Sequence, residues 1–475
     1  MSSAARKLHA DCRSNLTPAK RPPHAHIERR ISVKKGIFVG DDGRSVRKPF
    51  AAGVIGNVVE WYDFGIYGYL SIYLAANFFK GDGAIPILAI FATFAVGFVF
   101  RPLGGLFFGS FGDRHGRKNA LAIVVIGISA ATLGIGLLPT VAQIGWLAPV
   151  LLVAFRSIQG FCAGGEYAGA SSFLYEYAPR RHRGLFGGFL GVSTYVAFLI
   201  GSLLSWALAA NLSQADMNDW GWRIPFLLAG PLGIVGFLIR YRIEDTPKFH
   251  EISSGEEIQD RPVRFALSKN RLMIVLLTGF LFSNAVGPYL LITYVPAYLT
   301  RSVGFSASEA LRFSTMVVIL MIVLLPIVGA ISDRVGRKPV MLASTILYVL
   351  VPIPAFSLIS AGDPTGVIVG QALLAVAQSV STGIAAVVIS EIFPVRVRYT
   401  GASISYNTAY VIFGGTAPFV ATYLVDITGN VLMPAYYVVV IALISTLFAL
   451  KLPETHTRNR ADSMLPGRAG VEETT

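Results

Sequence analysis

The chain has 475 residues, of which 53% are hydrophobic and only 14% are charged, yet its formal net charge is +13. Soluble globular proteins carry about 25% charged residues, so this composition argues against a soluble enzyme, a disordered scaffold and a disulfide-rich secreted protein. The two cysteines, Cys12 and Cys162, predict no disulfide framework.

Long apolar stretches indicate a membrane protein, because a helix needs about 20 mostly apolar residues to cross a bilayer. We expect an all-α membrane protein of twelve transmembrane helices in two six-helix halves. The first six expected helices cover residues 50–76, 85–112, 119–140, 147–178, 185–210 and 224–241. The second six cover residues 272–299, 307–332, 339–360, 366–393, 400–425 and 431–451.

Hydrophilic segments divide the chain. Residues 1–49 contain twelve Lys or Arg residues and no long apolar run, which predicts a mostly disordered basic tail rather than a signal peptide. The two six-helix halves are expected at 50–243 and 272–452, separated by a central loop at 244–271. A short tail follows at 453–475.

The basic residues predict the orientation. Of the 40 Lys and Arg residues, 34 lie in the tails and in the loops that alternate helix ends place on one side. The opposite loops hold only Lys80, Arg223 and Arg301. Cytoplasmic loops are enriched in Lys and Arg, so we expect a multi-pass cell-membrane protein with both termini in the cytoplasm. The positive charge then reflects topology and lipid contact rather than a nucleic-acid partner.

Two loop motifs occur once in each half. Residues 112–118 (GDRHGRK) match 332–338 (SDRVGRK), and residues 176–183 (EYAPRRHR) match 391–398 (EIFPVRVR). Both motifs fall in expected cytoplasmic loops. A parallel repeat of two six-helix halves is typical of a transporter that works by rocking, alternating access.

The loop signature G-x-x-x-D-R-x-G-R-K, present twice, resembles that of the major facilitator superfamily. More narrowly, the chain resembles the metabolite:proton symporter family, which includes permeases for proline and betaine, 2-oxoglutarate, citrate and shikimate. Further segments carry this resemblance: residues 56–65, 101–105, 159–167, 220–226, 244–249 and 413–418. The resemblance implies the major facilitator fold and proton-coupled transport of a small metabolite.

Five ionisable residues are expected deep in the membrane, all in the first half: Glu60, Asp63, Arg101, Arg156 and Glu166. At 1.5 Å per residue, Glu60 and Asp63 lie about 15–20 Å from the cytoplasmic helix end. Charges at this depth are costly and mark functional sites. We expect Glu60 or Asp63 to carry the proton, with Glu166 as the alternative, and Arg101 or Arg156 to pair with a carboxylate or bind an anionic substrate. Static helix packing is the competing interpretation for Asp63 and Glu166.

Neutral polar residues near the same depth are candidates for orienting the substrate. Asn57 and Tyr67 share a face of the first helix with the two acids, and Gln159 lies on the same stripe as Arg156. The second half has no expected midplane charge. Its candidates are polar residues of three helices: Asn284, Tyr289, Gln378, Tyr406 and Asn407.

The repeated loop motif suggests a conformational latch. The resemblance implies that such loops hold neighbouring helices in one state, which assigns this role to Asp113, Arg114 and Arg117 and to their repeats Asp333, Arg334 and Arg337. A charge cluster that only sets topology is the alternative.

The expected function is proton-coupled import of a small organic acid or related polar metabolite. An osmolyte importer for proline or glycine betaine is the alternative, and a non-transporting membrane sensor is a third hypothesis. The sequence lacks a G-x-x-x-x-G-K-[ST] motif and histidines within the expected spans. We therefore expect no metal, no cofactor, and the proton gradient as the driving force.

Overall fold

A computed structural model describes residues 47–115, 117–164, 166–241, 267–268, 270–394 and 398–456. Throughout these residues the regular structure is helical, and no strand occurs in them. The predicted all-α fold of twelve spans in two six-helix halves is confirmed. The N-terminal tail, most of the central loop and the end of the C-terminal tail lie outside the described residues.

The first half consists of six spans, three of which are split in two. In chain order they are α1 (Arg47–Tyr69) with α2 (Ser71–Phe78), α3 (Ile85–Val99) with α4 (Arg101–His115), α5 (Arg117–Leu137), α7 (Leu147–Ala163) with α8 (Glu166–Tyr177), α9 (Arg183–Asn211) and α11 (Arg223–Tyr241). Short helices lie in the connections: α6 (Val141–Ile144), η1 (Arg180–His182), α10 (Gln214–Asp216) and the π-helical turn η2 (Met217–Gly221).

The second half repeats this plan. Its spans are α14 (Arg271–Tyr289) continued by η3 (Leu290–Tyr294), α15 (Val295–Tyr298) and η4 (Leu299–Val303), then α16 (Ala307–Val335), α17 (Arg337–Leu350) with α18 (Pro352–Ser360), α19 (Pro364–Glu391), α20 (Arg398–Ala409) with η6 (Tyr410–Gly414) and α21 (Ala417–Thr428), and α22 (Met433–Lys451).

Eight of the described helices are long and apolar enough to cross a membrane, and α17 with α18 makes a ninth if their 41° bend is counted as one span. The other three spans are α1 with α2, α5, and α7 with α8. The expected helices were continuous, whereas the structure breaks several of them. Proline or glycine accompanies three of these breaks: Pro102 follows the break between α3 and α4, Gly164 is the C-cap of α7, and Pro288 precedes the π-helical turn η3.

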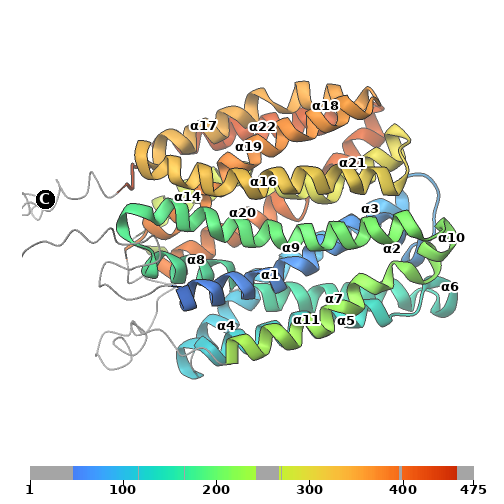
Figure 1. Cartoon of the computed structure of the whole chain (residues 1–475), viewed down its shortest axis with the longest axis horizontal. Coiled ribbons are helices and arrows are strands. Elements are labelled where there is room, and N and C mark those ends of the chain that lie inside the picture. The colour runs from blue at the N-terminus through green and yellow to red at the C-terminus, as the bar shows by residue number, and fades with distance from the viewer. Residues whose placement is uncertain are drawn as a thin grey trace, which may run out of the picture. The chain divides into compact units, whose positions relative to one another are not determined.

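Figure 1 shows the spans running side by side, with their junctions gathered at two ends of the bundle. The junctions of α4 with α5 and of α16 with α17 lie at one end, which we call the termini end because α1 begins and α22 finishes there. The junctions of α2 with α3 and of α9 with α10 lie at the opposite, distal end. The boundary where first-half helices touch second-half helices, chiefly α9 along α16, is called the seam.

Glycines allow the closest helix contacts. A Cβ atom added to Gly160 on α7 would overlap the carbonyl group of Gly97 on α3. Small residues of this kind let membrane helices approach closely, since apolar burial gives no driving force in lipid. The contact brings α3 and α7 together beside Arg156, one of the five expected membrane charges.

We expect Gly160→Ala to destabilise the protein by about 1–3 kcal/mol, because the added methyl group forces these two backbones apart. Gly230→Ala on α11 is the matched control, since its Cβ would lie 3.4 Å from Leu133, an ordinary contact distance. Thermal unfolding of the purified variants in detergent measures both effects. Equal unfolding temperatures for the two variants would contradict the proposed tight crossing.

Candidate functional site in the membrane interior

A buried network surrounds Asp63 on α1. Its Oδ1 accepts hydrogen bonds from Thr132 Oγ1 at 2.7 Å and Gln159 Nε2 at 2.6 Å. The Arg156 Nη1 atom lies 3.6 Å from Asp63 Oδ2, and it also donates to Gln159 Oε1 at 2.9 Å. The structure therefore brings an acid from α1, a hydroxyl from α5 and two side chains from α7 into one connected group.

Aromatic rings cover both membrane arginines. The Arg156 guanidinium carbon lies 4.2 Å from the ring centre of Tyr67 and 5.1 Å from that of Phe64. The Arg101 guanidinium carbon lies 4.4 Å from Phe64 and 4.5 Å from Phe98. Cation–π contacts strengthen when the cation is removed from water. Phe64 thus lies between the two guanidinium groups and contacts each of them.

All five predicted membrane charges are buried, each residue being at most 1% exposed. Two of them begin the second segment of a broken helix: Arg101 begins α4 and Glu166 begins α8. An acid in the first turn of a helix is favoured by the helix dipole, which stabilises Glu166 at that place. Arg101 lies over the ring of Phe98, which meets the ring of Tyr289, a second-half residue, at 5.1 Å, so Arg101 lies close to the seam.

A column of tyrosines crosses the seam beside these charges. Tyr167 of α8 stacks on Tyr406 of α20 with 4.4 Å between ring centres, and Tyr406 stacks on Tyr410 of η6 at 4.0 Å. Tyr289 of α14 meets Tyr410 edge-on at 6.1 Å and Phe98 of α3 at 5.1 Å. The hydroxyl groups of Tyr289 and Tyr406 are buried without a hydrogen-bond partner in the described chain. This tyrosine column, Tyr167, Tyr406, Tyr410 and Tyr289, offers aromatic surfaces and two unused hydroxyls at the seam.

The predicted second-half amides have partners of their own. Asn284 accepts a hydrogen bond from the Tyr410 hydroxyl at 3.0 Å and so orients one member of the column. Asn407 donates to the Gly164 carbonyl across the seam at 2.9 Å. Gln378 contacts the Tyr348 hydroxyl and donates to Thr382 at 2.6 Å. Of these three amides, Asn284 and Asn407 contact the tyrosine column or the seam directly.

Asn57 and Tyr67 flank the two acids of α1 along the helix: Asn57 precedes Glu60, and Tyr67 follows Asp63. The Asn57 amide donates to Ser193 and Thr194 of α9, each at 2.8 Å, and accepts from the Trp61 indole at 3.1 Å. This arrangement commits Asn57 to packing between α1 and α9. Tyr67 instead supports Arg156 with its ring and donates to the Ile90 carbonyl at 3.3 Å. The substrate-binding roles expected for both residues stay predictions.

Two members of the site were missed in the sequence. Thr132 is one of only two hydroxyl residues, with Ser129, in the apolar run of α5, and its contact with Asp63 depends on how α5 is rotated about its axis. Tyr167 follows directly after Glu166 in a segment that carries the family resemblance, so a signal was present. Its stacking partner lies on the other half of the chain, and no sequence spacing reports that contact.

The second-half latch residues lie at the termini end of the seam. Asp333 accepts hydrogen bonds from the backbone N–H groups of Gly184 at 2.7 Å and Leu185 at 2.8 Å, at the start of α9 in the first half. The Arg337 guanidinium lies 2.9 Å from Asp333 and 3.2 Å from Glu391 at the end of α19. Asp333 therefore links the two halves directly, which supports the latch hypothesis.

The contact between the halves does not extend to the other predicted latch residues in the described part of the chain. Arg334 is exposed at the end of α16. The side chains of Asp113, Arg114 and Arg117 lie outside the described residues, so their latch role stays a prediction. Close packing reinforces the Asp333 contact, because a Cβ on Gly184 would overlap the carbonyl of Gly329 on α16.

The segment after α22 caps the start of α17. Glu454 accepts hydrogen bonds from the backbone N–H groups of Arg337 at 2.9 Å and Lys338 at 3.0 Å, the first residues of α17. The neighbouring Thr455 donates to Glu391 at 2.8 Å. Partial burial alone would raise the pKa of Glu454, but the N–H groups of His456, Arg337 and Lys338 outweigh it and hold this pKa below its ordinary value of 4.5. A negative charge is also favoured at a helix N-terminus.

This lowered pKa predicts a pH-dependent contribution to stability. The unfolded state binds a proton on Glu454 more readily than the folded state, so the contribution is complete above the ordinary pKa and is lost as the pH falls through the folded value. We expect Glu454→Gln to lower stability by about 0.5 kcal/mol near neutral pH, with the difference shrinking at about pH 4. Thermal unfolding at both pH values measures this. Asp82 is exposed, so Asp82→Asn is the control. A loss of stability in Glu454→Gln that is equal at both pH values would contradict the capping role of Glu454.

Comparison with known proteins agrees with this geometry. Residues 50–272 match the family model described as "Sugar (and other) transporter", and residues 281–471 match "Major Facilitator Superfamily". The fold is similar to that of the proton:xylose symporter XylE bound to 6-bromo-6-deoxy-D-glucose, with a TM-score of 0.72 at 16% identity over 86% of this chain and 96% of that one.

Curated relatives are more similar in sequence. The proline/betaine transporter of Escherichia coli (strain K12) is 37% identical over 89% of this chain and 86% of its own length. The ectoine/proline transporter ProP of Corynebacterium glutamicum is 35% identical over 87% of this chain and 85% of its own length. A relative this similar over most of both chains shows the family. The chain therefore belongs to the major facilitator superfamily and is an integral membrane transporter rather than an enzyme.

Proposed function

We propose that the protein imports a zwitterionic osmolyte of the proline or glycine betaine type together with protons. The relatives named above as proline/betaine and ectoine/proline transporters support this substrate class. The broader prediction of a small organic acid or related polar metabolite includes these zwitterions. The observation that carries the narrower proposal is the balance of charge around the tyrosine column.

The central charges suit a ligand with both signs. The described membrane interior of the first half holds three buried acids and two buried arginines: Glu60, Asp63, Glu166, Arg101 and Arg156. A dicarboxylate or tricarboxylate would need an excess of cations, and this set has a formal excess of one negative charge. A zwitterion adds one charge of each sign. Arg101 can donate two hydrogen bonds to the carboxylate of the zwitterion, and Glu60 can lie opposite its ammonium group.

The tyrosine column suits the cationic end of such a ligand. Aromatic faces bind quaternary and secondary ammonium groups by cation–π attraction. The column borders Arg101 through Phe98, which packs against Tyr289, and through Trp61, which packs against Tyr167. Since Tyr289 and Tyr406 come from the second half and Tyr167 from the first, a ligand held there would touch both halves and sense their separation.

Asp63 and Arg156 form the proposed coupling pair. The ion pair is long, at 3.6 Å, and buried, so its strength depends on the charge of Asp63. A proton that arrives from outside neutralises Asp63, which weakens its hold on Arg156 as the site turns inward. Release of the proton inside restores the pair. The proton gradient then supplies the driving force without a further cofactor.

The proposed topology places the termini end in the cytoplasm and the distal end outside. The excess of basic residues in the termini-end loops supports this orientation. The halves at 50–243 and 272–452 would rock about the central site, with the loop at 244–271 between them. Asp333 and Arg337 would close the cytoplasmic side of the seam while the distal side opens.

Counterflow in proteoliposomes tests the substrate class. We expect proline or glycine betaine, and not citrate, 2-oxoglutarate or shikimate, to drive exchange in the purified protein. An imposed pH gradient should then drive accumulation of the same substrate. Exchange of the carboxylic acids alone would contradict the zwitterion proposal, and uptake that ignores the pH gradient would contradict proton symport.

Matched neutral variants separate coupling from binding. Asp63→Asn keeps the hydrogen bonds to Thr132 and Gln159, so we expect counterflow within about threefold of wild type and loss of gradient-driven accumulation. Glu60→Gln should raise the KM for counterflow about tenfold, because it removes the partner of the substrate cation. If Glu60→Gln lost only accumulation while Asp63→Asn kept it, the proton role would belong to Glu60.

A further inference from the structure

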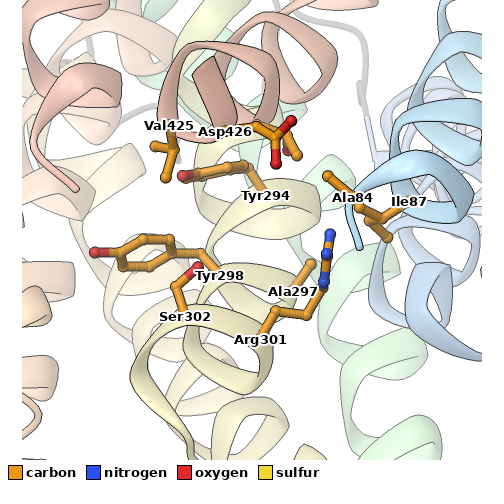
Figure 2. Close-up of a pocket in the computed structure, with 10 residues that line it drawn as sticks. Ala84, Ile87, Tyr294, Ala297, Tyr298, Arg301, Ser302, Val425 and Asp426 are labelled. Atoms are coloured by element: carbon orange, nitrogen blue, oxygen red, sulfur yellow. The ribbon is translucent and has the colours of Figure 1, made fainter. Parts of the chain in front are cut away.

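A second polar pocket lies at the distal end of the seam, away from the central site. It has a volume of about 100 Å³ and is open to the surface of the described chain. Ala84 and Ile87, at the start of α3, line it from the first half. Residues of η3, α15, η4 and α21 line it from the second half, among them Tyr294, Tyr298, Arg301 and Asp426. Figure 2 shows these two sets of residues on opposite sides of the pocket.

Two opposite charges face each other across this pocket. The Arg301 guanidinium donates one hydrogen bond, from Nη2 to the Gly83 carbonyl of the first half at 2.7 Å. Asp426 on α21 acts on Arg301 electrostatically from across the pocket, and Figure 2 shows its carboxylate pointing inward from the opposite wall. Arginine has five donors, so the contact with Gly83 leaves others available to a ligand. Both charged residues are exposed, and a small solute can reach them from the distal side.

Two tyrosine residues line the pocket beside these charges. Tyr294 and Tyr298 stack with ring centres 5.5 Å apart, and each side chain is 3% exposed. The Tyr298 hydroxyl is buried without a hydrogen-bond partner in the described residues. The pocket thus combines a guanidinium, a carboxylate and aromatic surface within a small volume.

We propose that this pocket is an entry site that captures the zwitterionic substrate before it reaches the central site. The carboxylate of the substrate binds Arg301, and its ammonium group lies against Asp426 and the rings of Tyr294 and Tyr298. A dianion would be repelled by Asp426, and an uncharged sugar would leave both charges unused. The inference rests on the proposed function for its ligand class and for placing the distal end outside.

The position of the pocket at the seam gives the entry site a second property. Its walls come from both halves, and Arg301 already joins them through Gly83. A ligand between Arg301 and Asp426 therefore occupies the pocket while the distal seam is closed. Separation of the halves then opens the inner wall of the pocket toward the interior. The substrate is thus captured in the pocket first, and the same pocket then opens toward the interior.

Initial-rate uptake in proteoliposomes, with proline and glycine betaine as the probes, tests the entry site. Asp426→Asn removes the cation partner without touching the central residues, and we expect the uptake KM to rise about two- to fivefold with Vmax unchanged. Because exposed charges are screened by salt, the increase should shrink as ionic strength rises. Asp82→Asn is the matched control, an exposed acid at the same end that does not line the pocket.

Arg301→Lys is the second variant. It keeps the charge and loses the two-pronged geometry, so it should raise KM less than Asp426→Asn. A KM for Asp426→Asn equal to that of Asp82→Asn, or a fall in Vmax with KM unchanged, would overturn the entry site and leave a purely structural role. Failure of the proposed function looks different, because the wild-type protein itself would then show no uptake of either probe.

Discussion

The ion pair between Asp63 and Arg156 is the interaction on which the rest of the interior depends. An isolated charge at the membrane centre is costly, and a buried pair remains stable only when its other hydrogen-bonding atoms find partners. Thr132 and Gln159 supply such partners to the acid, and aromatic rings cover the guanidinium. Three helices, α1, α5 and α7, are thereby fixed relative to one another, and binding of one proton by Asp63 changes the balance of all of them.

This arrangement separates the tasks of the two halves. The first half holds every described charge near the midplane, whereas the second half presents tyrosines and amides to the same region. Neutralisation of a charge in the first half can therefore influence the second half through the tyrosine column. At the ends of the seam, Asp333 and Arg301 each contact backbone groups of the first half. Each of these contacts involves few atoms, so separating the halves breaks only a few hydrogen bonds at either end.

Much of this fold was predictable from the sequence, because the bilayer thickness dictates the length of each span and loop charge dictates its direction. The five membrane charges were also identified, since ionisable residues stand out against apolar surroundings. Their pairing was not: Asp63 pairs with Arg156 rather than Arg101 because of how α1, α4 and α7 are rotated, and helix periodicity alone leaves that rotation open.

The missed features share one physical cause. Thr132, the stacking of Tyr167 on Tyr406, and the Glu454 cap on α17 are contacts between segments far apart in the chain. Each involves a common residue type with no distinctive local spacing. The helix breaks were partly visible as proline and glycine, yet the alignment of the two broken helices that carry Arg101 and Glu166 required the three-dimensional structure.

Proton uptake on substrate binding tests the central claim most directly. Purified protein in weakly buffered detergent solution is mixed with proline or glycine betaine, and the pH change is recorded for wild type and Asp63→Asn. Coupling through Asp63 and Arg156 predicts that wild type takes up protons on binding and that Asp63→Asn binds without doing so. Equal proton uptake by the two proteins would contradict the account, because the coupled proton would then reside on another group.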